Sequence, residues 1–314
     1  MSNVSRVPPR TFKVGGFVVS VGRDGASNRT ASHAPAPSPA SGPLLLADPP
    51  PVHTVTRRPA EGVDFIEDRI ARRTDPVSGD LADQVAAHPW YHTLELPGGL
   101  VTEGFYDHRE LVSAYGLPDD LSGRRALDVG SADGFWSFEL ERRGARVTAV
   151  DIASTDDVDL PEPVRALARA RGLTDPLRDG FELAKRALGS EVELVTQSVY
   201  DLDPERLGTF DLVHLGDILL HLREPLRALE RVRAVTGGEA LISDVFDPGL
   251  EGNGVTRYAG GWRTAGWWVP SLDTLAQLVL DAGFARCEVL TTYRLSPRGE
   301  VDGPWRAVLR AHAS

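Results

Sequence analysis

Short apolar runs alternate with amphipathic segments through most of the chain after residue 120, which is the pattern of repeated strand–helix units. Strands are predicted at residues 125–130, 146–151, 191–196, 210–215, 239–245, 286–294 and 305–311. Helices are predicted at Trp136 to Arg143, Val164 to Arg171, Pro225 to Val235 and Leu272 to Ala282. This alternation indicates an α/β protein with a doubly wound, mainly parallel sheet.

The last two predicted strands follow one another without a helix. A turn-forming segment, Ser296-Pro297-Arg298-Gly299, joins them, so we expect them to form a hairpin. The sequence therefore predicts a seven-stranded, Rossmann-like sheet with an antiparallel last strand, and we assign residues 121–314 to this domain.

The N-terminal part of the chain has a different pattern. Residues 1–60 are rich in Pro, Ala and Ser and contain one β-like stretch, Thr11 to Ser20, so a disordered tail is predicted there. Residues 61–120 combine a helical pattern from Val63 with strand-like alternation at Trp90–Leu96. We interpret residues 61–120 as an N-terminal extension or lid.

Charge and cysteine content narrow the classes of function. The net charge is −11, and residues 1–60 hold seven Arg or Lys against two Asp, a charge of +5, which leaves −16 for residues 61–314. Such an acidic body disfavours nucleic acid as a partner. The single cysteine, Cys287, excludes an intramolecular disulfide and a thiolate-rich zinc site. Without an apolar run of about eighteen residues or a signal-peptide core, we expect a cytoplasmic protein without a membrane span.

Candidate chemistry begins in the segment Asp128–Gly134, which reads D-V-G-S-A-D-G and follows a predicted strand. Gly130, Ala132 and Gly134 allow the backbone to approach a ligand closely. Asp151 ends the next strand, where an acid accepts hydrogen bonds from both hydroxyls of a ribose. The spacing G-x-A-x-G differs from the G-x-G-x-x-G of a dinucleotide site. An adenosine-containing cofactor other than a dinucleotide is therefore predicted.

The same segment resembles motif I of the class I S-adenosyl-L-methionine (SAM) methyltransferases, D-x-G-x-G-x-G, with Ala132 at the middle glycine. The resemblance implies SAM as cofactor. In that family an aspartate after the third strand holds the adenine amino group, and Ser198 takes its place here. Asp133 is interpreted as a cap of the following helix. The residues predicted to bind the cofactor are Asp128, Gly130, Ser131, Ala132, Gly134, Asp151, Ser198, Val199 and Gly216.

A second resemblance covers roughly residues 90–295. Residues 215–226 are similar to the G-x-L-Y-H-R-x-x-P-L segment of the enzymes that carboxymethylate wobble uridine in tRNA with carboxy-SAM, and residues 266–271 to their W-F-I-P-S segment. This chain has one extra residue between Gly216 and His221, and Leu220 stands where that subgroup has a carboxylate-binding tyrosine. Ordinary SAM is therefore the expected cofactor.

His221 is the candidate catalytic residue, because an imidazole accepts a proton near neutral pH. The alternative is a histidine that only anchors its loop through a hydrogen bond. Asp217 and His221 have a spacing that suits a metal, but a third ligand is not visible and no metal site is predicted. Aromatic residues are predicted to form the substrate wall or its lid: Trp90, Tyr91, Trp262, Trp267 and Trp268.

Together these features predict SAM-dependent methylation of an oxygen, or a nitrogen, of a small-molecule metabolite, in specialised metabolism. One alternative is a tRNA-modifying methyl or carboxymethyl transferase. The other is a non-catalytic SAM-binding subunit that partners an active enzyme. The sequence leaves the oligomeric state open, and a homodimer is compatible with it.

Overall fold

The computed structural model describes residues 10–14, 17–21, 80–173, 176–260, 266–298 and 303–314. Most of the predicted tail, residues 1–60, and the helical pattern from Val63 lie outside the described residues. Within the tail, β1 (Arg10–Val14) and β2 (Phe17–Val21) form an antiparallel hairpin over the stretch predicted to be β-like. This hairpin belongs to a separate unit of the chain, Met1–Val55.

The second unit is built on a seven-stranded sheet. Its strands are β5 (Arg125–Val129), β6 (Arg146–Asp151), β7 (Glu193–Thr196), β8 (Phe210–Gly216), β9 (Thr236–Val245), β12 (Arg286–Arg294) and β13 (Trp305–His312). The order is β12-β13-β9-β8-β5-β6-β7. Neighbours from β7 to β9 are parallel, whereas β13 is antiparallel to both β9 and β12. The predicted sheet with an antiparallel last strand is confirmed.

The helices agree with the prediction in four places and add to it in others. The predicted helices are α3 (Phe135–Arg142), α4 (Glu162–Ala170), α7 (Pro225–Val235) and α8 (Leu272–Asp281). The sequence did not predict α2 (Leu81–Ala87), α5 (Asp179–Leu188) and α6 (Pro204–Leu207). In the described part of the chain, no helix has the length and apolar character needed to cross a membrane.

Short elements complete the second unit. The strand expected at Trp90–Leu96 is reduced to β3 (Glu95–Leu96), which pairs with β4 (Leu100–Val101). A second small ribbon joins β10 (Thr256–Tyr258) to β11 (Trp268–Pro270). The 3-10 helices are η2 (Pro97–Gly99), η3 (Arg109–Ala114), η4 (Thr155–Asp157), η5 (Val199–Asp201) and η6 (Leu219–His221).

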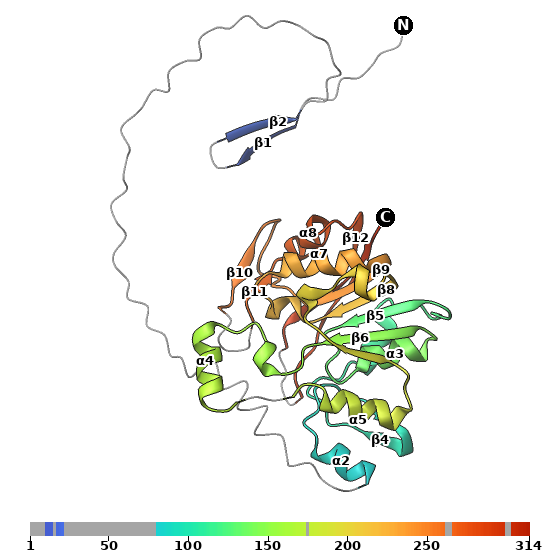
Figure 1. Cartoon of the computed structure of the whole chain (residues 1–314). Coiled ribbons are helices and arrows are strands. Elements are labelled where there is room, and N and C mark those ends of the chain that lie inside the picture. The colour runs from blue at the N-terminus through green and yellow to red at the C-terminus, as the bar shows by residue number, and fades with distance from the viewer. Residues whose placement is uncertain (1–9, 15–16, 22–79, 174–175, 261–265, 299–302) are drawn as a thin grey trace, which may run out of the picture. The chain divides into compact units, whose positions relative to one another are not determined.

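Helices cover both faces of the sheet, with α7 and α8 on one side and α3 and α5 on the other (Figure 1). Successive strand residues point to opposite faces. In β5, Leu127 and Val129 pack in the cluster beneath α7 and α8, while Ala126 packs in the cluster that holds α3 and α5. Burial on both faces explains why the strands are nearly continuously apolar.

The strand order reverses at β5, and this reversal indicates where a ligand site is expected. The chain runs from β5 to β6 on one side, and β8 lies on the other side of β5. In open α/β sheets ligands bind beyond the carboxyl ends of the strands at such a switch point. Gly130, Asp151 and Gly216 stand at the carboxyl ends of β5, β6 and β8.

Candidate functional site

The glycine loop leaves β5 with three residues in the left-handed region. The φ angles are +78° at Gly130, +46° at Ala132 and +91° at Gly134. A Cβ on Gly130 would lie 2.4 Å from Cγ2 of Ile218, and one on Gly134 would meet the ring of Phe138 at 2.5 Å. Ala132 adopts a backbone conformation that favours glycine, so the loop is held in a strained form.

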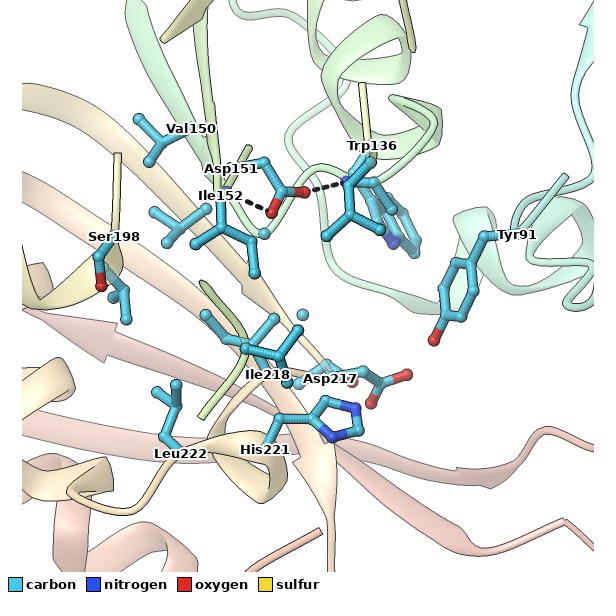
Figure 2. Close-up of a pocket in the computed structure, with 18 of the residues that line it drawn as sticks. Tyr91, Trp136, Val150, Asp151, Ile152, Ser198, Asp217, Ile218, His221 and Leu222 are labelled. Atoms are coloured by element: carbon cyan, nitrogen blue, oxygen red, sulfur yellow. Dashed lines mark hydrogen bonds between the residues drawn. The ribbon is translucent and has the colours of Figure 1, made fainter. Parts of the chain in front are cut away.

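Asp151 is oriented by this loop. Its Oδ2 accepts the Ala132 N–H at 2.7 Å and its Oδ1 accepts the Ile152 N–H at 2.8 Å (Figure 2). A carboxylate oxygen can accept a further hydrogen bond after each of these. The Asp151 carboxylate therefore lies at the cavity in a fixed orientation.

An open cavity of about 1490 Å³, its mouth included, lies over the carboxyl ends of β5, β6 and β8. The predicted site residues that line it are Tyr91, Gly130, Ala132, Asp151, Ser198, Val199, Gly216 and His221. Figure 2 shows Asp151 and Ser198 at one end, and Tyr91, Asp217 and His221 pointing into the other. One cavity thus joins most of the predicted cofactor residues to the candidate base.

Asp128 does not line this cavity. It is buried beneath the loop, where its carboxylate accepts the Ser137 hydroxyl at 2.5 Å and contacts Nδ1 of His214 at 2.7 Å. Nε2 of His214 in turn lies 2.8 Å from the Tyr115 hydroxyl, which reaches the cavity wall. We interpret Asp128 as the end of a buried polar chain that supports the loop and Tyr115.

Other predicted residues are also buried away from the cavity. Ser131 is 2 % exposed, and Gly134 begins α3 without facing the cavity. Trp90 packs inside and donates its Nε1–H to the Val85 carbonyl at 2.8 Å. The prediction that Asp133 caps α3 was wrong, because Gly134 is the N-cap and has no side-chain cap bond. The Asp133 carboxylate instead bonds to the N-terminal extension.

The tryptophans expected in the substrate wall face elsewhere. Trp267 donates its Nε1–H to the Asp159 carbonyl at 2.6 Å, and the Arg223 guanidinium lies 4.9 Å from its ring centroid. Trp268 donates to the Arg223 carbonyl at 3.1 Å and lines a second, mainly apolar cavity between η6, α7 and α8. Trp262 lies outside the described residues. The structure brings neither described ring to the cavity above β5.

Two buried histidines lie in the cavity wall where the tryptophans were expected. They were not identified as site residues from the sequence. His92 and His108 line the cavity with 5 % and 3 % exposure, and their ring centroids are 5.2 Å apart. Burial lowers the pKa of both imidazoles, further in His108 than in His92. The lowered pKa values favour the neutral form of both rings, which lie in an aromatic wall that also contains Tyr91 and Trp136. Their buried Nδ1 atoms have no hydrogen-bond partner among the described residues. For His92 the only sequence signal was its place beside Tyr91, and His108 had none.

Asp217 lies in the same wall, paired with Arg306 from β13. The Nε of Arg306 contacts Asp217 Oδ2 at 2.8 Å, and the two side chains are 4 % and 13 % exposed. Asp217 has a φ of +53°, and its buried Oδ1 has no hydrogen-bond partner among the described residues. A non-glycine residue in this conformation at a cavity is typical of a functional position. Because Arg306 comes from a distant strand, this pair could not be recognised from the sequence.

The comparison with family models agrees with this fold. The sequence model of a methyltransferase-domain family matches residues 102–289, more than half of the chain. The chain therefore belongs to this family. Its seven-stranded sheet with antiparallel β13 agrees with the fold expected from the resemblance to the class I methyltransferases.

Among curated proteins, the chain is similar to the ubiquinone biosynthesis O-methyltransferase of Xanthomonas oryzae pv. oryzae, with 35% identity over 127 residues. The match covers 40% of this chain and 44% of that protein. The protein of the same name from Xanthomonas euvesicatoria pv. vesicatoria is 32% identical over 126 residues, again 40% of this chain and 44% of the relative. The chain thus spans less than half the length of these curated relatives.

Solved structures give more distant likenesses. The N-terminal domain of EvdMO1, crystallised in the presence of S-adenosylhomocysteine (SAH) and D-fucose, is 21% identical with a TM-score of 0.49. That match covers 74% of this chain and 94% of the domain. The 1,6-didemethyltoxoflavin-N1-methyltransferase of Burkholderia thailandensis is 19% identical with a TM-score of 0.43, over 83% of this chain and 93% of that one.

Proposed function

We propose that this protein transfers the methyl group of SAM to an oxygen of a small molecule, with nitrogen as the less favoured acceptor atom. The observation that carries the proposal is the single cavity above β5, β6 and β8. One end holds Asp151 and Ser198, and the other holds Tyr91 and His221. The O-methyltransferase name of the matched curated relatives supports oxygen as the acceptor atom.

Several residues fit the cofactor. Asp151 is poised to accept the ribose hydroxyls, while Ser198 and Val199 lie at the end expected to hold the adenine. Gly130 and Gly216 line the cavity with backbone alone. Bound SAM supplies a methyl group on a cationic sulfur that is already a good leaving group. Catalysis by the protein therefore consists mainly of alignment and of accepting the acceptor's proton.

The charges around the cavity limit the acceptor. Among the described lining residues there are four aspartates and neither Arg nor Lys. The aspartates are Asp151, Asp157, Asp159 and Asp217. Asp217 and Asp159 pair with Arg306 and Arg223, but neither guanidinium lines the cavity. The described wall therefore offers no Arg or Lys cation to a phosphate and favours a neutral or cationic ligand. It therefore favours a small molecule over the tRNA of the alternative function.

His221 is the proposed proton acceptor. It stands in η6 directly after the switch-point strand β8, and its imidazole faces the cavity near Asp217 (Figure 2). A neutral imidazole there takes the proton of an acceptor hydroxyl as the oxygen attacks the methyl carbon. The competing interpretation, a histidine that only anchors η6, predicts a much smaller effect of its removal.

The test of this function has two measurements on the whole chain. Calorimetric titration is expected to show binding of SAM and SAH and no binding of NAD. A panel of hydroxylated aromatic compounds and unphosphorylated sugars, incubated with SAM, is expected to give SAH release with at least one member. SAM binding without turnover of any acceptor, together with a stable heteromeric partner, would favour a non-catalytic subunit instead.

Asp151→Ala is expected to weaken SAM binding by roughly 1.5–3 kcal/mol, the scale of lost hydrogen bonds to a charged group. Asp151→Asn is the matched comparison, because it retains one carbonyl oxygen and nearly the same volume. It should lose less affinity than the alanine variant. Wild-type affinity in Asp151→Ala, measured by the same titration, would remove Asp151 from the cofactor site.

Tyr91→Ala is expected to raise the acceptor KM and to leave SAM affinity nearly unchanged, which is the effect of losing uniform acceptor binding. Trp268→Ala is the comparison, because that ring lines the second cavity. Steady-state kinetics should show little change in its acceptor KM. If Trp268→Ala raised the acceptor KM more than Tyr91→Ala did, the acceptor wall would instead be formed by the tryptophan segment.

A further inference from the structure

Asp133 lies in the glycine loop, but its side chain turns away from the cofactor cavity. The residue is 1 % exposed and does not line the cavity. Its Oδ2 accepts two backbone N–H groups of the N-terminal extension, from Tyr91 at 2.5 Å and from His92 at 3.1 Å. A single carboxylate oxygen thus holds two consecutive residues that are about forty positions away in the chain.

The other oxygen of Asp133, Oδ1, lies in a space that exists because residue 180 is a glycine. Nε2 of His88 lies 3.9 Å from Oδ1, an ion-pair distance that is too long for a hydrogen bond. A Cβ on Gly180, in the first turn of α5, would approach both of these atoms to 2.4 Å. Burial raises the pKa of Asp133, but the nearby His88 side chain and the hydrogen bond from the His92 N–H lower it by more, so the pKa lies below its usual value.

The two residues held by Asp133 form part of the acceptor wall. Tyr91 and His92 both line the cavity, and Figure 2 shows the Tyr91 side chain pointing toward the end occupied by Asp217 and His221. The segment is also tied to its own neighbours, because the Tyr106 N–H donates to the Tyr91 carbonyl at 2.8 Å. Asp133 is therefore the point at which the glycine loop holds the acceptor wall.

The neighbouring residues of the loop face the cofactor. Ala132, the residue before Asp133, lines the cavity and donates its N–H to Asp151 at 2.7 Å. A ligand that restrains Ala132 also restrains the N–H and Cα of Asp133, because these atoms share one planar peptide unit with Ala132. The position of the Asp133 carboxylate then fixes Tyr91 and His92.

We propose that Asp133 is a positioning residue that couples cofactor binding to the acceptor wall. Binding of the cofactor orders the glycine loop. The two hydrogen bonds to Asp133 then restrain the backbone of Tyr91 and His92. This proposal rests on the function proposed above. It implies that the acceptor end becomes fully formed only once the cofactor is bound.

Hydrogen–deuterium exchange of the whole protein with and without SAH tests the coupling, and it requires no knowledge of the acceptor. In the wild type, SAH is expected to slow exchange in peptides of the loop, residues 129–135, and also in residues 90–93. The expected slowing at residues 90–93 is about fivefold or more, the lower end of measured couplings between sites. Asp133→Ala is expected to retain loop protection and to lose the protection of residues 90–93.

Two further variants sharpen the result. Asp133→Asn offers an amide oxygen that can accept the same two N–H groups, so it should restore most of the protection. Glu139→Ala removes another acid, one that pairs with Arg142 and Arg143 on α3, and should behave as the wild type. Thermal melting checks that each variant is folded, and the wild-type comparison remains decisive if Asp133→Ala is not.

The outcomes separate the two proposals. Protection of the loop without protection of residues 90–93 in the wild type would overturn the coupling and leave the proposed function in place. Equal protection of residues 90–93 in Asp133→Ala and in the wild type would also overturn it. Failure of SAH to protect the loop at all would overturn the proposed function, and the coupling with it.

Discussion

Replacing Gly130 with valine is expected to abolish measurable SAM binding. Gly130 has a φ of +78°, which a β-branched residue tolerates poorly, and a Cβ there would lie 2.4 Å from Cγ2 of Ile218. That atom branches directly from the Cβ of Ile218, the residue before η6, so relief of the clash requires a change of the Ile218 χ1 rotamer or a shift of the backbone. Calorimetric titration with SAM measures the loss.

A matched glycine separates backbone strain from the clash. Gly123 has a φ of +75° in the turn before β5, and a Cβ there meets nothing within 4 Å. Gly123→Val should therefore lose stability through strain, by roughly 1–2 kcal/mol, yet bind SAM normally. If both variants bound SAM equally, close approach at Gly130 would not be required, and the placement of the cofactor would fail.

His221→Ala is expected to lower kcat by roughly a hundredfold or more, because removal of a positioned base costs about that much. The wild-type kcat should fall as the pH drops through the pKa of His221, since the protonated imidazole cannot accept a proton. His92 and His108 are expected to titrate at lower pH than an ordinary imidazole, because burial lowers their pKa values. The alanine variant should lack the acidic fall in kcat.

The pH profile also decides between the two roles of His221. An anchor of η6 would cost only a small factor in kcat, and the alanine variant would retain the acidic limb. In that case another group titrates and His221 is not the base. SAM affinity of the variant, measured in parallel, shows whether η6 has kept its place beside Ile218.

Much of the fold was predictable because each strand carries its own signal. A buried strand between two helical layers must be apolar along its length, and that is visible locally. The missed helix α5 shows the limit of such reasoning. Gly180 lowers the helical signal in its first turn, yet it is there to make room for Asp133 and His88. A glycine is needed at this position because of a contact with a distant segment of the chain, which the local sequence does not show.

The cofactor end of the site was predictable because its residues lie close together in the sequence. The acceptor end was not predictable, because its residues lie far apart in the sequence. The loop residues Gly130 and Ala132 and the strand-end Asp151 lie within two consecutive strand–helix units, and their spacing alone indicates their use. The acceptor wall is assembled from segments far apart in the chain. The sequence around Arg306 and around Asp133 does not indicate the partner of either residue, because each contacts its partner only in the folded protein.

The position of β13 has a consequence for the order of assembly during synthesis. It is the last strand of the sheet along the chain, yet it lies between β9 and β12. As the chain grows from its N-terminus, β12 emerges with no strand to pair with until residues 305–312 follow. Arg306 arrives in the same step, so the carboxylate of Asp217 gains its counter-charge only when the sheet closes. A nascent chain halted before that strand would therefore expose one edge of β9 to pairing with other chains and would hold an acceptor end without its balanced charge.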